Sequence, residues 1–111
     1  MSEPTPYVFQ DVTQYAVSML PLNAEERDMF EIKVQWRGRG LWAVTRHSSC
    51  QNSAGAFAYE PSPSNRDAEW LDDNRFTLGD ALDRAREACQ HIIVNGHHVS
   101  DVRAALEATD V

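Results

Sequence analysis

The chain has 111 residues, a formal net charge of −7 and an apolar fraction of 42%. These values predict one globular domain that folds without a metal ion or a disulfide, and they exclude wholesale disorder. No apolar stretch is long enough to cross a bilayer, no secretory leader precedes the first apolar pattern, and the two cysteines lack the spacing of a disulfide framework, so we expect a cytoplasmic protein.

Residues 1–14 are predicted to form a loose N-terminal segment, because prolines and polar residues precede any regular apolar pattern. Residues 7–12 are a candidate extension of the first strand. The single domain is then expected over residues 15–109. It opens with a half-buried strand at residues 15–20, which Pro21 ends, and the polar segment 23–28 leads to the next strand.

The clearest pattern lies at residues 30–37, where apolar side chains alternate with charged or polar ones over eight positions. This alternation predicts a strand with one dry face, and residues 41–46 form its hairpin partner. A three-residue loop with Gly40 in a left-handed bulge position gives the most favourable register and places both tryptophans on the dry face. The predicted cross-strand pairs are Trp36 with Trp42, Val34 with Val44, and Lys33 with Thr45.

The second half of the chain is predicted to begin with a polar turn at residues 48–55 and a further strand at residues 56–59. The sheet is then an antiparallel meander of three or four strands. A short helix is expected at residues 64–74, capped by Ser64 and turning Trp70 and Leu71 inward.

The main helix is predicted to begin after Thr77, which caps it together with Asp80. Asn95-Gly96 ends it, and Ser100 caps a last helix. A short strand at residues 92–94 is the competing interpretation. The apolar stripe of the main helix consists of Leu78, Ala81, Leu82, Ala85, Cys89, Ile92 and Ile93. The predicted fold class is therefore α+β, an antiparallel sheet with the C-terminal helices packed on one face.

The negative charge is concentrated in the second half, where residues 60–111 carry eleven acidic and five basic side chains. Such a field favours a basic partner surface and repels nucleic-acid phosphate. We therefore predict a non-enzymatic binding or regulatory protein that contacts a partner protein, with no cofactor, no membrane contact and no assigned oligomeric state. The predicted partner-binding residues are Asp72, Asp73, Asp80, Asp83 and Glu87.

The alternative hypothesis is a nucleic-acid-binding domain that uses the hairpin. Basic side chains lie on or beside it, with Trp36 and Trp42 interleaved, and a cationic sheet with aromatic side chains can stack bases. The overall charge opposes this interpretation. The residues of this alternative face are Lys33, Arg37, Arg39 and Arg46.

A metal-binding or hydrolytic protein is the third hypothesis. Thiol and imidazole side chains, which suit zinc, occur at His47, Cys50, Cys89, His91, His97 and His98. Their spacing matches no recognised zinc finger or knuckle, so we predict no metal site. Cys50 follows His47 by three residues, but a nucleophilic thiol needs an activating charge or helix N-terminus that the sequence does not supply.

The sequence resembles two groups of known proteins. The hairpin, followed by Phe76-Thr77-Leu78-Gly79-Asp80-Ala81-Leu82 at the start of a helix, resembles HicB-type antitoxin domains, with Thr77, Asp80 and Ala81 at the matching positions. That resemblance implies a protein that neutralises a small RNA-cleaving toxin, although residues 48–75 are inserted and no DNA-binding module follows. Residues 36–106, including the run 59–66, are similar to small uncharacterised proteins of actinobacteria and their phages, which implies an accessory cytoplasmic protein and no particular activity.

Overall fold

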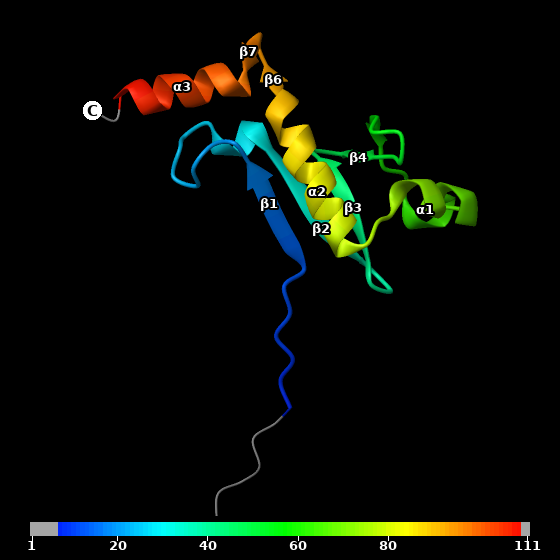
Figure 1. Cartoon of the computed structure of the whole chain (residues 1–111). Coiled ribbons are helices and arrows are strands. Elements are labelled where there is room, and N and C mark those ends of the chain that lie inside the picture. The colour runs from blue at the N-terminus through cyan, green and yellow to red at the C-terminus, as the bar shows by residue number, and fades with distance from the viewer. Residues whose placement is uncertain (1–6, 110–111) are drawn as a thin grey trace, which may run out of the picture.

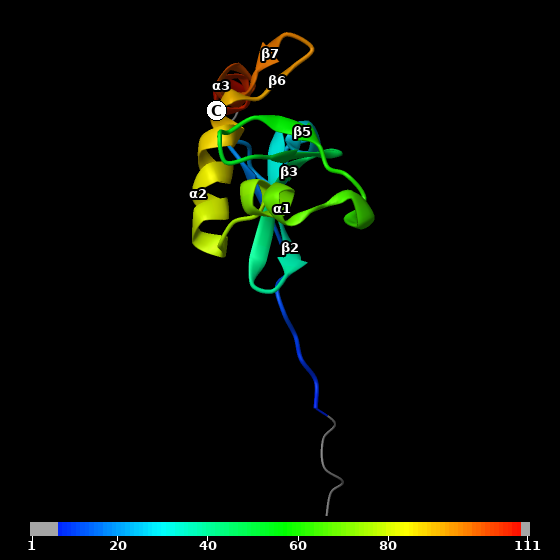
Figure 2. The same ribbon diagram turned by 90° about the vertical axis from the view of Figure 1, so that its right-hand side faces the viewer.

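The computed structural model describes residues 7–109 and confirms the α+β class (Figure 1). One antiparallel sheet follows the order of the chain as a meander, with α2 packed along one side of it (Figure 2). It contains five strands rather than three or four, because the run expected to be a polar turn includes β4. The strands are β1 (Gln14–Ser18), β2 (Glu31–Gly38), β3 (Leu41–Arg46), β4 (Ser49–Gln51) and β5 (Phe57–Tyr59).

Strand β1 begins one residue earlier than predicted and ends two residues earlier, at Ser18. The Ser18 hydroxyl donates to the Phe30 carbonyl and accepts from the Leu20 amide at 3.0 Å, which turns Leu20 into the core. At the other end, the Thr13 carbonyl accepts from the Trp36 amide at 2.9 Å. Residues 7–12 do not extend the strand, because the register would place Val12 opposite the irregularity at Arg37 and residues 7–10 beyond Gly38, where β2 ends. Residues 1–6 of the predicted loose segment lie outside the described residues.

The predicted hairpin register is confirmed at Trp36–Trp42, Val34–Val44 and Lys33–Thr45. The predicted loop is wrong, because Gly38 pairs with Leu41 and Arg37 is the extra, bulged residue. Only Arg39 and Gly40 form the turn, with φ values of 56° and 72°, and positive values at both positions match the twist of a hairpin. Trp36 is 49% exposed rather than dry, because the hairpin extends beyond the start of α2 (Figure 1).

Helix α2 (Leu78–Ala88) begins as predicted, with the Thr77 side chain accepting from the Asp80 amide at 3.4 Å. Ala81 and Ala85 are fully buried against the sheet, and their small side chains allow close approach of the helix. The predicted helical stripe is too long. After η3 (Cys89–His91), the chain forms the competing strand β6 (Ile93–Val94), which pairs with β7 (His97–His98) across Asn95-Gly96.

Helix α3 (Val99–Thr109) contacts η3 and β7 and projects beyond the sheet (Figure 1). Ser100 is not its cap. The His98 ring accepts from the Ser100 amide at 3.1 Å instead, because the strand ends at His98 and its imidazole reaches the first free amide of the helix. No helix within residues 7–109 is both long and apolar enough to cross a membrane.

The segment between β5 and α2 differs from its prediction in both cap and burial. It forms η2 (Pro63–Asn65) and then α1 (Ala68–Asn74), and Asp67 rather than Ser64 is the cap, accepting from the Trp70 amide at 2.8 Å. Leu71 is exposed, because α1 lies beside the sheet rather than on it (Figure 1). The remaining short helix, η1 (Arg27–Phe30), begins within the predicted connection and includes Phe30, the first residue of the predicted strand, so that β2 begins at Glu31.

Residues following α1 continue the sheet edge where β4 stops. Phe76 exchanges two backbone hydrogen bonds with Trp42, at 2.8 and 2.9 Å. Alternation along this extended segment sends Phe76 into the core under α2 and Arg75 to the other face. A charged side chain from the segment between α1 and α2 therefore meets the face of the sheet that α2 leaves uncovered.

Candidate functional site

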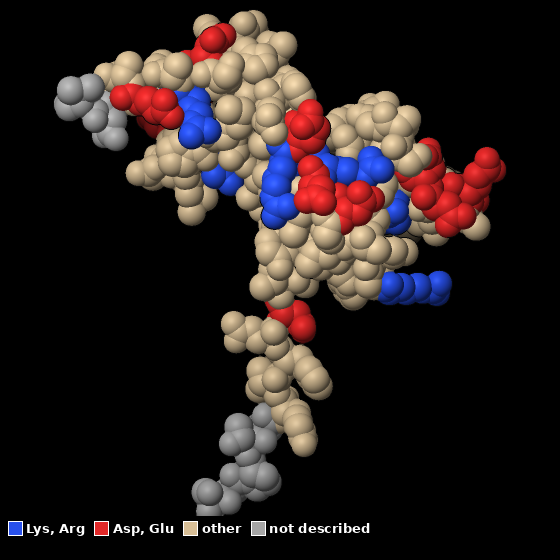
Figure 3. Space-filling model, in the orientation of Figure 1, with Lys and Arg blue, Asp and Glu red and all other residues tan. Residues whose placement is uncertain are grey.

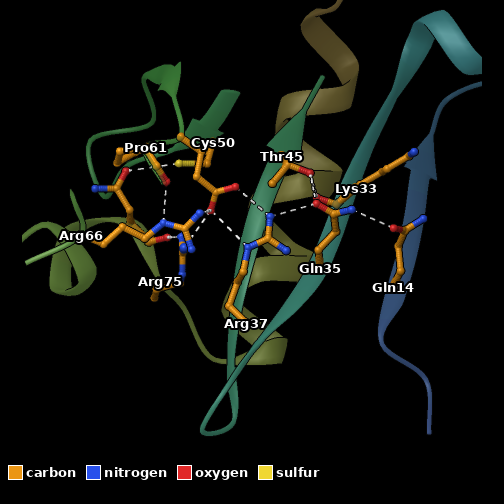
Figure 4. A network of polar contacts seen from close by, with 11 residues as sticks. Gln14, Lys33, Gln35, Arg37, Thr45, Cys50, Pro61, Arg66 and Arg75 are labelled. Carbon is orange, nitrogen blue, oxygen red and sulfur yellow. Dashed lines mark hydrogen bonds and ion pairs between the residues drawn. The ribbon is translucent and has the colours of Figure 1, made fainter. Parts of the chain in front are cut away.

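The sheet face opposite α2 carries a connected set of polar side chains (Figure 4). The Gln35 amide group donates to Gln14 at 2.8 Å, and its oxygen accepts from the Thr45 hydroxyl at 3.0 Å and from Arg37 at 3.2 Å. These side chains come from three neighbouring strands. Their polar groups form hydrogen bonds with one another across the sheet. Arg37 connects this set to a cluster of charged side chains.

That cluster, the Glu60 cluster, consists of Glu60, Arg37, Arg66 and Arg75. The Glu60 carboxylate lies 2.8 Å from Arg37 Nη2, 2.7 Å from Arg75 Nη2 and 3.7 Å from Arg66 Nη2. Arg66 and Arg75 also lie near the Trp70 ring, with guanidinium carbons 5.7 and 4.8 Å from its centroid. One carboxylate thus joins β2, the residue after β5 and both ends of the α1 segment.

Burial and charge act in opposite directions on these groups. Burial raises the pKa of Glu60, but the hydrogen bond and positive charge of Arg37, with the charges of Arg75 and Arg66, outweigh it and leave the pKa below its ordinary value. Burial lowers the pKa of Arg75, against the opposing effect of Glu60. A carboxylate held ionised in this way is a poor general acid at neutral pH. The arrangement is that of a structural ion-pair cluster.

The two cysteines lie apart and are both buried. Cys50 is in β4, with its sulfur 3.7 Å from the Asn74 side-chain oxygen, and not in a polar loop as the sequence predicted. Burial raises the pKa of the Cys50 thiol, and the nearby Glu60 charge raises it further. Burial also raises the pKa of the Cys89 thiol. Neither thiol has the environment of an activated nucleophile.

The histidines do not gather around the cysteines. His47 is exposed in a turn, and His97 is exposed in β7. His91 lies 2.9 Å from Glu87 on the helix surface, and His98 caps α3. Across residues 7–109, no group of three or more His, Cys, Asp or Glu side chains is placed to hold a metal ion. The structure therefore does not bring together the six residues considered for zinc.

The predicted acidic face is divided between α1 and α2 and mixed with basic side chains (Figure 3). On α2, Asp80 pairs with Arg84 at 3.1 Å, Asp83 with Arg86 at 2.9 Å, and Glu87 with His91. On α1, Asp73 accepts from the Ser53 amide and hydroxyl, and Asp72 is exposed. These exposed pairs are weak and exchangeable, but they reduce the local excess of negative charge.

The predicted basic hairpin face is also divided. Arg37 is engaged by Glu60, and the Arg46 guanidinium donates to the Met29 carbonyl at 3.4 Å. Lys33 lies on the open face of the sheet, and Arg39 occupies the hairpin turn. Two of the four predicted basic residues therefore serve contacts within the domain.

A further candidate binding segment, which was not predicted from the sequence, precedes β1. Residues 7–13, the N-terminal arm, run away from β1 in an extended conformation and protrude from the body (Figures 1 and 3). Four large apolar side chains of the arm are open to solvent, with exposures of 96% for Tyr7, 80% for Val8, 85% for Phe9 and 61% for Val12. The consecutive apolar residues 7–9 within a polar segment were the available sequence signal.

A search among known proteins found that no family model matches the chain and that no curated protein or solved structure is significantly similar to it. The resemblances to HicB-type domains and to actinobacterial and phage proteins thus stay predictions.

Proposed function

We propose that this chain is a non-enzymatic binding protein of regulatory or accessory type that contacts a partner protein through its N-terminal arm. The observation that carries the proposal is the exposure of Tyr7, Val8, Phe9 and Val12 on one extended segment that leads into the edge strand β1. Soluble domains rarely expose contiguous apolar surface unless it binds something. The cytoplasmic, phage-encoded or accessory setting implied by the resemblances belongs to this proposal.

The chemistry of the arm suits a known mode of recognition. An extended peptide binds by adding to a sheet edge or by lying in a groove, where backbone hydrogen bonds and alternate side chains both contribute. Fully burying side chains such as Val or Phe stabilises a complex by about 1.5–3 kcal/mol each. Ordering the arm and losing rotational freedom offset part of that gain. Three or four anchors of this size are enough for a specific, reversible contact.

The acidic helical residues complete the proposal as a source of electrostatic steering. Their pairing with Arg84, Arg86 and His91 leaves the exposed Asp72 and the net charge of −7 as the main attraction for a basic partner. Complementary charge raises association rates more than it tightens binding. Raised salt should therefore slow association, and an association rate that is insensitive to ionic strength would rule out this part of the proposal.

The test of arm-mediated binding is affinity capture from source cells with the full chain as bait. The variant Tyr7→Ser/Phe9→Ser removes two exposed anchors, and Leu22→Ser, at an 81% exposed position outside the arm, is the matched control. A protein retained by the wild type and by Leu22→Ser but lost from the arm variant supports the proposal. Identifying the retained protein would also show whether it is a small RNA-cleaving toxin, the partner that the HicB-type resemblance implies. Equal retention by all three baits would contradict it.

Nucleic-acid binding is the second candidate, and one observation favours it. Trp36 is half exposed, close to the Arg39 turn, and an exposed tryptophan beside a basic side chain is suited to stacking on an unpaired base. Single-stranded DNA and RNA oligonucleotides titrated at low salt, with Trp36→Ala as the variant and Tyr59→Ala as an exposed aromatic control, test it. Binding that is salt-dependent and lost only in Trp36→Ala would favour this function over arm-mediated protein binding.

A further inference from the structure

A wide groove lies at the end of the molecule opposite the arm. It has a volume of about 1020 Å³ and is formed where the end of β1, the end of α2 and the side of α3 meet. Its apolar floor includes Val17, Met19, Leu20 and Leu106, three of which are only partly buried, and polar and charged side chains line its sides. A groove of this size with an apolar floor and polar sides suits a short extended segment that carries both apolar and polar side chains.

The arm cannot fill the groove of its own chain. The hydrogen bond between Thr13 and Trp36 holds the chain on its course out of the sheet, so a return would require a reversal within residues 10–13. After such a turn, residues 7–9 would span only about 10 Å, at roughly 3.3 Å per residue. They would run beside Gln14–Ala16 and stop short of the groove, which begins at Val17 and continues to Thr109 on α3.

We propose that the arm of one copy lies in the groove of a second copy, so that two chains associate by exchanging arms. The inference rests on the proposed function, because it names the partner of the same apolar arm. The arm leaves β1 at one end and the groove lies at the other (Figure 1), so that reciprocal exchange can join two copies side by side. An isologous contact of this kind closes at two chains.

Charge at the rim of the groove matches the arm. The arm carries one charged residue, Asp11, next to its apolar residues, and the charged residues that line the groove are Arg86, Arg103 and Glu107. Each arginine has an exposed partner on its own helix, Asp83 at 2.9 Å and Glu107 at 3.0 Å. Exposed pairs of this kind are weak, so a guanidinium at the rim is able to turn to Asp11. The apolar floor provides affinity, and the arginines fix the direction of the arm.

The test is the solution mass of the full chain across a concentration series, measured by sedimentation or light scattering. We expect the wild type to approach twice the 12.5 kDa chain mass. Tyr7→Ser/Phe9→Ser removes arm anchors that are almost fully exposed in the single chain, and Met19→Asp places a charge on the groove floor. Each should stay monomeric, with association weakened at least about tenfold. Circular dichroism and melting temperature confirm that both variants fold.

Mixing the two variants distinguishes arm exchange from non-specific association. The arm variant keeps its groove and Met19→Asp keeps its arm, so an equimolar mixture should form a heterodimer that neither variant forms alone. A photo-crosslinking residue at position 9 should join heavy-isotope and light-isotope chains, with crosslinks at residues 17–20 or 103–109. A wild type that stays monomeric, a dimer that persists in the arm variant, or crosslinks confined to one chain would each overturn the inference. Arm-dependent capture of another protein by a monomeric wild type would overturn it while leaving the proposed function intact.

Discussion

Arg75 Nη2 lies 2.7 Å from a carboxylate oxygen of Glu60, and only 2% of the Arg75 side chain is exposed. This pair joins the residue that precedes the α2 segment to the residue that follows β5. Since Arg37 and Arg66 share the same carboxylate, the single negative charge of Glu60 is the common counter-charge of three guanidinium groups. Loss of the carboxylate is therefore more harmful than loss of any one arginine.

Glu60→Gln should destabilise the domain by about 3 kcal/mol, because it leaves the buried Arg75 guanidinium without a counter-charge while keeping the size of the side chain. The free energy of unfolding from urea titration measures it. Glu69→Gln, at an exposed acidic position on α1, is the control and should change stability by less than about 0.5 kcal/mol. A loss below 1 kcal/mol in Glu60→Gln would show that the cluster adds little stability.

The stability of the wild type should fall in acid. The pKa of Glu60 in the folded protein is below its ordinary value, so the carboxylate contributes stability that is present above the unfolded-state pKa and is lost as the pH falls through the lower, folded-state pKa. Unfolding free energies measured between neutral pH and about pH 3 should decline less steeply in Glu60→Gln. Parallel pH profiles for the two proteins would contradict the assignment.

Both thiols should resist modification in the folded protein. Burial raises the pKa of Cys50 and of Cys89, so little thiolate forms and reagent access requires opening of the structure. Labelling with a thiol-reactive chromogenic reagent at about pH 8 should be slower in the native protein than in urea by a factor on the order of 100. The single variants Cys50→Ala and Cys89→Ala each leave one thiol, so they assign each labelling rate to one cysteine. A thiol that is labelled in the native protein as fast as in urea would contradict the burial of that cysteine.

Two glycine substitutions should change the stability of the fold in opposite directions. Gly96 has a φ of +80° in the β6–β7 turn, where alanine is strained, so Gly96→Ala should destabilise by about 1 kcal/mol. Gly79 lies in the first turn of α2 with no atom within 4 Å of a new Cβ, and Gly79→Ala should stabilise by up to about 0.5 kcal/mol. Thermal unfolding of both variants measures the signs. A stabilising Gly96→Ala would show that the turn is formed differently.

Local patterns predicted the central hairpin and the main helix. The alternation at residues 30–37 and the 3.6-residue spacing after Thr77 each determine which side chains face the core, so the Trp36–Trp42 register and the α2 cap agree with the structure. The burial of Cys50 was not predictable in this way. Strand β4 is three residues long and polar, and it exists because β3 offers it an open edge.

The sequence by itself determined the fold class, the hairpin register and the apolar composition of the arm, because each depends on residues near one another in the chain. Only the tertiary structure decided that Arg37, Glu60 and Arg75 share one ion-pair cluster, that the zinc-type side chains stay apart, and that the arm leaves the domain opposite the groove beside α3. The ion-pair cluster depends on the path of residues 48–75 around the sheet edge, because this segment carries Glu60 and Arg75. The polar composition of the segment carries no periodicity from which that path could be inferred.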